Sequence, residues 1–250
     1  MADAQTETPA LKPLDEDWET ALAVVAHPDD MEFGAAAAVA RWTGQGKRVV
    51  YCMATAGEAG IDGMEPERTR EVRTAEEIES ARIVGVDTVE FLGLPDGIVE
   101  YGVPLRRLIA RMVRVHKPEI VITGNFQQFF PNRILNQADH IAVGRATLDA
   151  VRDAGNRWVF PEPGIEPWGG VRQVWVSGSP DARHGVDISD TFDAGVASLR
   201  AHQAYLDGLG WVDFDPAAFL ASMAEPAGEL MGTRYATSFE VFSLTFSGDD

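Results

Sequence analysis

The feature that most constrains the fold is a regular alternation of short apolar runs and longer helical stretches between residues 21 and 153. The apolar runs predict strands at residues 21–26, 48–54, 86–92 and 119–123. The stretches between and after them predict helices at residues 31–44, 67–85, 103–116 and 138–153. Such alternation is typical of a parallel sheet with helices on both faces. We therefore predict an α/β fold with a Rossmann-like, doubly wound, mostly parallel sheet.

The pattern weakens beyond residue 153. Strands are predicted at residues 172–177 and 237–246, with a helix at about 189–206 between them. Residues 161–170, rich in proline and glycine, indicate a surface loop. Residues 1–15 are polar and acidic, which predicts a loose N-terminal tail. The domain prediction is one α/β domain over residues 16–250, whose part from about residue 155 forms a smaller extension that shapes the substrate site.

Composition excludes several partners and locations. The 250 residues carry a formal net charge of −18, so a polyanion would be repelled and no nucleic-acid partner is predicted. The arginines of residues 105–114 lie at helical spacing opposite an apolar stripe, which favours a solvated helix face. Cys52, the single cysteine, lies in an apolar run and is expected to be a buried thiol in a reducing, cytoplasmic location. No stretch reaches the ~18 apolar residues that a membrane span requires.

The strongest chemical signal follows the first predicted strand, where the chain reads His27-Pro28-Asp29-Asp30-Met31-Glu32. Imidazole and carboxylates are costly to bury unless they are paired or bound to a metal. His27 and Asp30 are three residues apart across a strand-to-helix turn, and His140 follows the fourth strand. The carboxyl ends of parallel strands meet at one edge of the sheet, so these three side chains are predicted ligands of Zn²⁺, with Fe²⁺ as an alternative.

Asp29 is left beside the predicted metal as a carboxylate that can take a proton from the attacking water, and it is the predicted catalytic base. An alternative interpretation stands beside this one. An acidic residue followed three positions later by glutamate is also the pattern of a helix N-cap, and Asp139-His140 would fit the opening of another helix equally well.

The segment Ala26–Glu32 resembles the signature of the LmbE-like, or PIG-L-like, zinc-dependent N-deacetylases. Weaker matches follow in order at residues 55–58, at Arg73, at residues 92–97 and at residues 138–140. The resemblance implies His27, Asp30 and His140 as zinc ligands and Asp29 as the general base. It also implies that Arg73 and Asp96 hold the sugar or a phosphate-like group. From the residues alone, Arg73 is equally well a solvated arginine, and Asp96 a turn residue.

The chain departs from the family pattern at Gln137, where many members have a histidine that stabilises the oxyanion or protonates the leaving amine. An amide can donate a hydrogen bond to an oxyanion, which makes Gln137 a predicted substrate-binding residue, but it is not a general acid. Asp139, which supports that histidine in the family, is a predicted catalytic residue here. His202 resembles a C-terminal family histidine and could fill the gap, while a helix-surface histidine is the simpler interpretation.

These observations predict a zinc-dependent hydrolase that removes an N-acyl group, most simply N-acetyl, from an N-acetylglucosamine-type conjugate. An amidase of a mycothiol-type thiol conjugate and a metal-binding protein without catalysis are the alternatives. A nucleotide-binding module is disfavoured because the first turn has no glycine-rich phosphate cradle. The partner is therefore a small molecule. Residues 126–131 hold three phenylalanines, which would line a pocket or contact a second subunit, so a homo-oligomer stays open.

Overall fold

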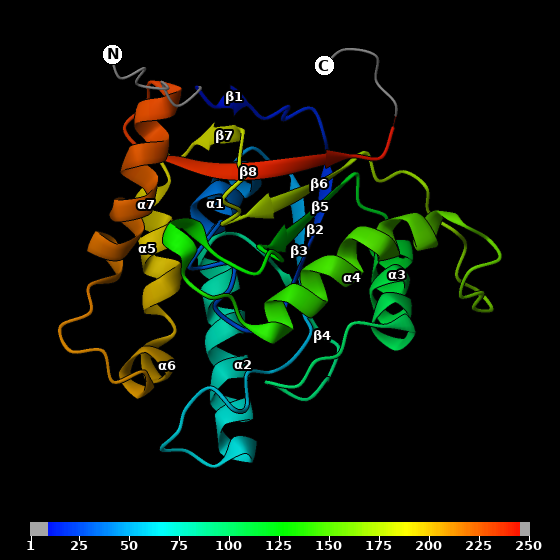
Figure 1. The fold of residues 1–250 in the computed structure, drawn as a ribbon, viewed down its shortest axis with the longest axis horizontal. Coiled ribbons are helices and arrows are strands. Elements are labelled where there is room, and N and C mark those ends of the chain that lie inside the picture. Colours follow the sequence, from blue (N-terminus) through cyan, green and yellow to red (C-terminus); the bar gives the residue numbers. More distant parts are fainter. Residues whose placement is uncertain (1–9, 246–250) are drawn as a thin grey trace, which may run out of the picture.

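The computed structural model describes residues 10–245, which are built around one eight-stranded sheet of order β1-β7-β8-β6-β5-β2-β3-β4 (Figure 1). The strands are β1 (Lys12–Pro13), β2 (Thr20–Val25), β3 (Arg48–Met53), β4 (Thr88–Phe91), β5 (Ile120–Gly124), β6 (Gln173–Ser177), β7 (His184–Asp187) and β8 (Ala236–Ser243). Strands β2 to β6 run parallel, and β8 runs antiparallel to both of its neighbours, β6 and β7. The predicted mostly parallel α/β sheet is confirmed.

The sheet reverses its strand order at β2, which pairs with β3 on one side and with β5 on the other. The chain therefore leaves the carboxyl ends of β2 and β5 in opposite directions. In doubly wound sheets this position is where ligands bind. Both predicted histidine ligands follow one of these two strands.

Helices cover both faces of the sheet (Figure 1). The helices are α1 (Ala36–Gly44), α2 (Pro66–Ile83), α3 (Val103–His116), α4 (Ala138–Gly155), α5 (Phe192–Arg200), α6 (Gln203–Gly208) and α7 (Pro216–Met231), with a 3₁₀ turn at Pro131–Arg133. Side chains alternate along each strand, so Ala21 and Ala23 join a core with α1, α5 and α7, whereas Leu22 and Val24 join a core with α3 and α4. This burial on both faces explains why β2 is a continuous apolar run.

Several predicted boundaries were wrong. The predicted loose tail extends too far, because β1 pairs with β7 and the flanking Leu11 and Leu14 are buried; residues 1–9 lie outside the described part. The part from about residue 155, predicted as a smaller extension of the one domain, adds β6, β7 and β8 to the sheet. The helix predicted at 189–206 is two helices, α5 and α6, and α7 was missed.

Two predictions on single side chains also differ from the structure. Arg114 is 4% exposed instead of solvated, because its guanidinium donates to backbone carbonyls of residues 153–160. His202 is fully buried, so the interpretation as a surface histidine was wrong. Cys52 is buried as predicted. Within residues 10–245, no helix is long and apolar enough to cross a membrane.

Candidate metal centre

The turn after β2 explains why the acidic pair does not cap a helix. The predicted helix at 31–44 begins only at Ala36, and its N-cap residue, Ala35, makes no side-chain capping bond. The Asp30 carboxylate instead turns back along the chain, and its Oδ2 accepts the backbone N–H groups of Ala26 and His27, both at 2.9 Å. The capping interpretation is therefore wrong, and Oδ1 of Asp30 is left free for another partner.

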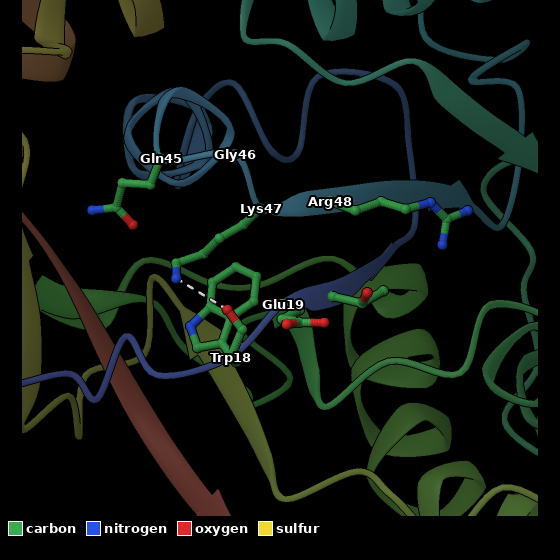
Figure 2. Close-up of a pocket in the computed structure, with 7 residues that line it drawn as sticks. Trp18, Glu19, Gln45, Gly46, Lys47 and Arg48 are labelled. Carbon is green, nitrogen blue, oxygen red and sulfur yellow. Dashed lines mark hydrogen bonds between the residues drawn. The ribbon is translucent and has the colours of Figure 1, made fainter.

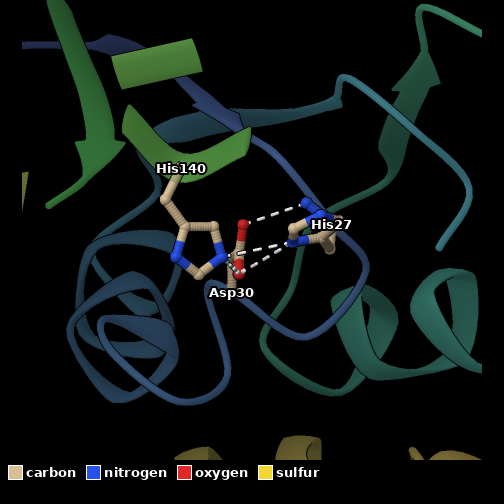
Figure 3. Close-up of side chains that lie close together, drawn as sticks. All are labelled: His27, Asp30 and His140. Carbon is tan, nitrogen blue, oxygen red and sulfur yellow. Dashed lines mark hydrogen bonds and ion pairs between the residues drawn. The ribbon is translucent and has the colours of Figure 1, made fainter. Parts of the chain in front are cut away.

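Three side chains converge near the carboxyl ends of β2 and β5 (Figure 3). His140, from the first turn of α4, places Nε2 at 3.0 Å from Asp30 Oδ1 and at 3.2 Å from His27 Nδ1. His27 Nδ1 lies 3.8 Å from Asp30 Oδ1. Two imidazoles and one carboxylate are the donor set of many catalytic zinc and non-haem iron sites, and these separations allow one cation to contact all three atoms.

The remaining nitrogen of each imidazole is held by a second residue. The Asn136 amide donates to the carbonyls of Asn125 and Gln127, so its Oδ1 faces His140 Nδ1 at 2.9 Å. That contact places the proton on Nδ1 of His140 and leaves the Nε2 lone pair for a cation.

His27 is oriented in the same way by two carboxylates. Its Nε2 lies 3.0 Å from Asp96 Oδ1 and 3.3 Å from Asp139 Oδ2, so it donates there and leaves Nδ1 free. Burial lowers the pKa of His27, but hydrogen bonds with Asp139, Asp30 and Asp96 outweigh it and raise that pKa well above the usual range. The metal-facing atoms are therefore His27 Nδ1, His140 Nε2 and Asp30 Oδ1.

His27, Asp96 and Asp139 form a second, overlapping group with metal-like spacing, but three of its four carboxylate oxygens already accept backbone N–H groups. Asp139 accepts the backbone N–H groups of Gly97 and Val99 at 2.8 and 3.0 Å, and Asp96 accepts that of Ala59 at 2.8 Å. Of these two overlapping groups, the predicted three residues are therefore the better fit to a metal. Asp96 and Asp139 were predicted to bind substrate and to act in catalysis, and the structure places both behind His27.

Asp29 lies beside this centre in a strained conformation. Its φ of 106° is in the left-handed region that favours glycine, which costs of the order of 1–3 kcal/mol. Two contacts hold it there: Arg73 Nη2 donates to Asp29 Oδ1 at 2.7 Å, and the Asp29 N–H donates to Glu77 Oε2 at 3.2 Å. Burial raises the pKa of the Asp29 carboxyl, although the Arg73 guanidinium opposes the shift. A raised carboxyl pKa suits a general base.

Arg73 is 2% exposed, so the interpretation as a solvated arginine was wrong. Besides Asp29 it donates to the carbonyls of Pro28 and Gly57, and the ring of Tyr205 covers its guanidinium at 3.9 Å. Burial raises the pKa of Tyr205, and the charge of Asp29 and a hydrogen bond with it add to that shift. Sequence reasoning missed Tyr205, which lies in α6, a short helix without a clear periodic signal.

Gln137 and the phenylalanines of residues 126–131 lie near His140 or farther along the same loop. Gln137 is exposed at the N-terminus of α4, next to the helical turn that carries His140. Of the three phenylalanines in residues 126–131, Phe130 packs edge-on against His140 at 6.1 Å between ring centroids, and Phe126 packs against Phe242. Phe130 therefore lines the metal centre.

A separate surface hollow lies at the opposite, amino-terminal edge of β2 and β3 and is lined by residues 18–20 and 45–48 (Figure 2). Lys47 Nζ donates there to the carbonyls of Glu16 and Trp18, at 2.7 and 3.0 Å. Its cation thus serves to hold the chain before β2, and the hollow contains none of the predicted site residues.

Comparison with known proteins gives consistent matches. A family model described as GlcNAc-PI de-N-acetylase (PIG-L) matches residues 22–151. Diacetylchitobiose deacetylase of Thermococcus kodakarensis is 28% identical over 226 residues, covering 88% of this chain and 82% of the relative. Mycothiol S-conjugate amidase of Streptomyces coelicolor is 28% identical over 165 residues, covering 56% of this chain and 54% of the relative. N,N'-diacetylchitobiose deacetylase from Pyrococcus horikoshii shares the fold, with a TM-score of 0.81 at 22% identity over 91% of this chain and 85% of that one.

Proposed function

Because this chain belongs to the GlcNAc-PI de-N-acetylase family, we propose that it is a metal-dependent hydrolase that removes the N-acetyl group from an N-acetylglucosamine-type conjugate. The observation that carries the proposal is the convergence of His27, Asp30 and His140 beside the buried carboxylate of Asp29. The diacetylchitobiose deacetylase of Thermococcus kodakarensis matches 88% of this chain, against 56% for the mycothiol S-conjugate amidase, which supports an amino sugar substrate.

His27, Asp30 and His140 would hold the metal, which we propose to be Zn²⁺, with Fe²⁺ as the alternative. When bound there, such an ion supplies Lewis acidity that polarises the amide carbonyl and lowers the pKa of water. Asp29 accepts a proton from the water molecule while the oxygen of that water attacks the carbonyl carbon. Arg73 and Glu77 hold Asp29 in place for this step, and Asp96 and Asp139 act through His27 as positioning residues.

The leaving amine needs a proton when the carbon–nitrogen bond breaks. Gln137 has no acidic proton, so we propose that Asp29 returns the proton that it took from the water. Gln137, exposed at the N-terminus of α4, donates an amide hydrogen bond to the oxyanion or to the substrate. A contact of Arg73 or Asp96 with the sugar stays a prediction, since both side chains are engaged within the protein.

The test is acetate release from N,N'-diacetylchitobiose and from an N-acetylglucosaminyl inositol by the zinc-loaded protein, with Asp29→Asn beside it. Loss of a general base lowers the rate by roughly 10²–10⁴-fold, and the metal content should not change. Asp149→Asn, farther along α4, is the control that should keep full activity. Full activity of Asp29→Asn would refute the assigned base. Full metal occupancy without turnover of any acetylated sugar would instead favour the non-catalytic alternative.

A second candidate is an amidase of a thiol conjugate, supported by the likeness to mycothiol S-conjugate amidase. The same residues would perform the same amide hydrolysis, so the two functions differ only in the substrate that the site accepts. Cleavage of a mycothiol-type conjugate with no release of acetate from the sugars would favour this candidate. For either function we propose a cytoplasmic location, because the one cysteine of the chain suits a reducing compartment.

A further inference from the structure

A second cluster of ionisable side chains is buried behind the metal centre. Glu32 comes from the turn after β2, Glu77 from α2, and His202 from the N-terminus of α6. None of the three side chains is exposed to solvent. His202 Nε2 lies 3.7 Å from Glu32 Oε2 and 3.6 Å from Glu77 Oε2, so three separate parts of the chain meet at one point.

These separations are longer than hydrogen bonds, and several polar atoms have no partner. Both ring nitrogens of His202, Oε2 of Glu32 and Oε1 of Glu77 are buried without a hydrogen bond. Unpaired buried polar atoms are rare and require an explanation. A cation bound at about 2.0–2.2 Å from each ligand in tetrahedral geometry places the ligand atoms roughly 3.4 Å apart. The observed spacing is close to that of a metal site and too long for direct pairing.

The negative charge of the two glutamates also favours a bound cation. Two glutamates share the cluster, and within residues 10–245 neither forms an ion pair with a lysine or arginine. Burial raises the pKa of Glu77 well above its usual value, and the charge of Glu32 adds to the shift. The buried hydroxyl of Tyr51 also lacks a partner; burial raises its pKa, and the charges of both glutamates add to that shift. One divalent cation would neutralise both carboxylates and satisfy the imidazole.

We propose that Glu32, Glu77 and His202 bind a second divalent metal ion, of the type that accepts imidazole and carboxylate ligands, such as Zn²⁺ or Mn²⁺. The ion ties α2 and the α5–α6 segment to the turn after β2. Glu77 also accepts the Asp29 N–H, so this ion acts on the reaction only by holding the backbone of Asp29.

The test is the number of zinc ions bound per chain, which does not depend on activity. Chelator-treated protein is loaded with Zn²⁺, desalted and analysed for metal. Wild type should bind two ions, and the first-site variant Asp30→Asn should keep one. Glu79→Gln, an exposed position two residues beyond Glu77, is the matched control and should bind two. Wild-type protein that binds a single zinc, lost in Asp30→Asn, would overturn the proposal.

A second measurement covers variants that fold poorly. In the Asp30→Asn/His140→Gln background, added Zn²⁺ should raise the melting temperature through the second site, because a ligand that binds only the native state stabilises it. Adding His202→Gln should abolish the shift. No shift in the first background overturns the second site, whereas the proposed deacetylase activity depends on the first site and is judged separately.

Discussion

Replacing Asp139 with asparagine removes one carboxylate oxygen from the network that orients His27. Oδ2 of Asp139 serves His27 Nε2 and the Gly97 N–H, while Oδ1 serves the Val99 N–H. An asparagine amide has one acceptor oxygen, and its other end is an NH₂ group. If the NH₂ replaces Oδ2, His27 and Gly97 lose their acceptor. If it replaces Oδ1, Val99 loses its acceptor. We therefore expect the substitution to loosen both the orientation of the His27 ring and the loop after β4.

The size of the loss in zinc affinity depends on the contact that His27 keeps. His27 Nε2 keeps the Asp96 carboxylate at 3.0 Å, so the loss should lie at the lower end of the 10–100-fold effect of such outer contacts. We expect about tenfold weaker zinc affinity, or ~1.4 kcal/mol. Asp96→Asn/Asp139→Asn removes both carboxylates and should approach about a hundredfold. The lost loop hydrogen bond should lower the free energy of unfolding of metal-free protein by about 1 kcal/mol.

Zinc affinity is measured by competition with a chromophoric chelator, and stability by urea unfolding of the metal-free protein. The control is Asp149→Asn, on the same helix, whose carboxylate accepts from the Tyr101 hydroxyl at 2.7 Å and touches no metal-facing residue. It should bind zinc as wild type does. If Asp139→Asn is folded and also binds zinc as tightly as wild type, the argument that Asp139 orients His27 is refuted.

Three further outcomes are expected. Tyr205→Ala should lower the free energy of unfolding by about 2 kcal/mol because it uncovers the Arg73 guanidinium, whereas Tyr205→Phe keeps the stacking and most of the stability; urea unfolding compares them. Arg114 donates to five backbone carbonyls, so Arg114→Lys should cost about 2–4 kcal/mol in the same assay, and exposed Arg111→Lys almost nothing. Burial raises the pKa of Cys52 to about 12, so the thiol stays protonated and should resist alkylation near pH 8 until urea unfolds the protein; fast labelling of native protein would contradict this.

The convergence of His27, Asp30 and His140 could be predicted because their position follows from strand direction. His27 and His140 each come after a parallel strand, and parallel strands place their carboxyl ends at one edge. The outer contacts could not be predicted in this way. Asn136, Asp96 and Tyr205 lie in loops or short helices, where no periodic pattern indicates which way a side chain points.

Polar burial explains why Arg73 on α2 was open to interpretation as a solvated arginine. Its buried positions include Thr69, Arg73, Glu77 and Ser80, so its inward face has the composition of a solvated one. Periodicity finds the buried face of a helix through its apolar stripe, so it does not mark a face that buries charged groups against a site. Helix α7 was missed for a related reason, because Pro226 and Gly228 lie inside it and are typical of helix ends.

The position of β8 has a consequence for the order in which the protein can be completed during synthesis. This strand, the last along the described chain, lies between β6 and β7, and β1 pairs only with β7 among the described strands. The early strands β2 to β5 and their helices can associate while the chain is still growing. β7 can pair with β8 only when residues 236–243 emerge from the ribosome, and β1 joins the sheet through β7. The edge of the sheet that holds β1, the first of the described strands, is therefore assembled last.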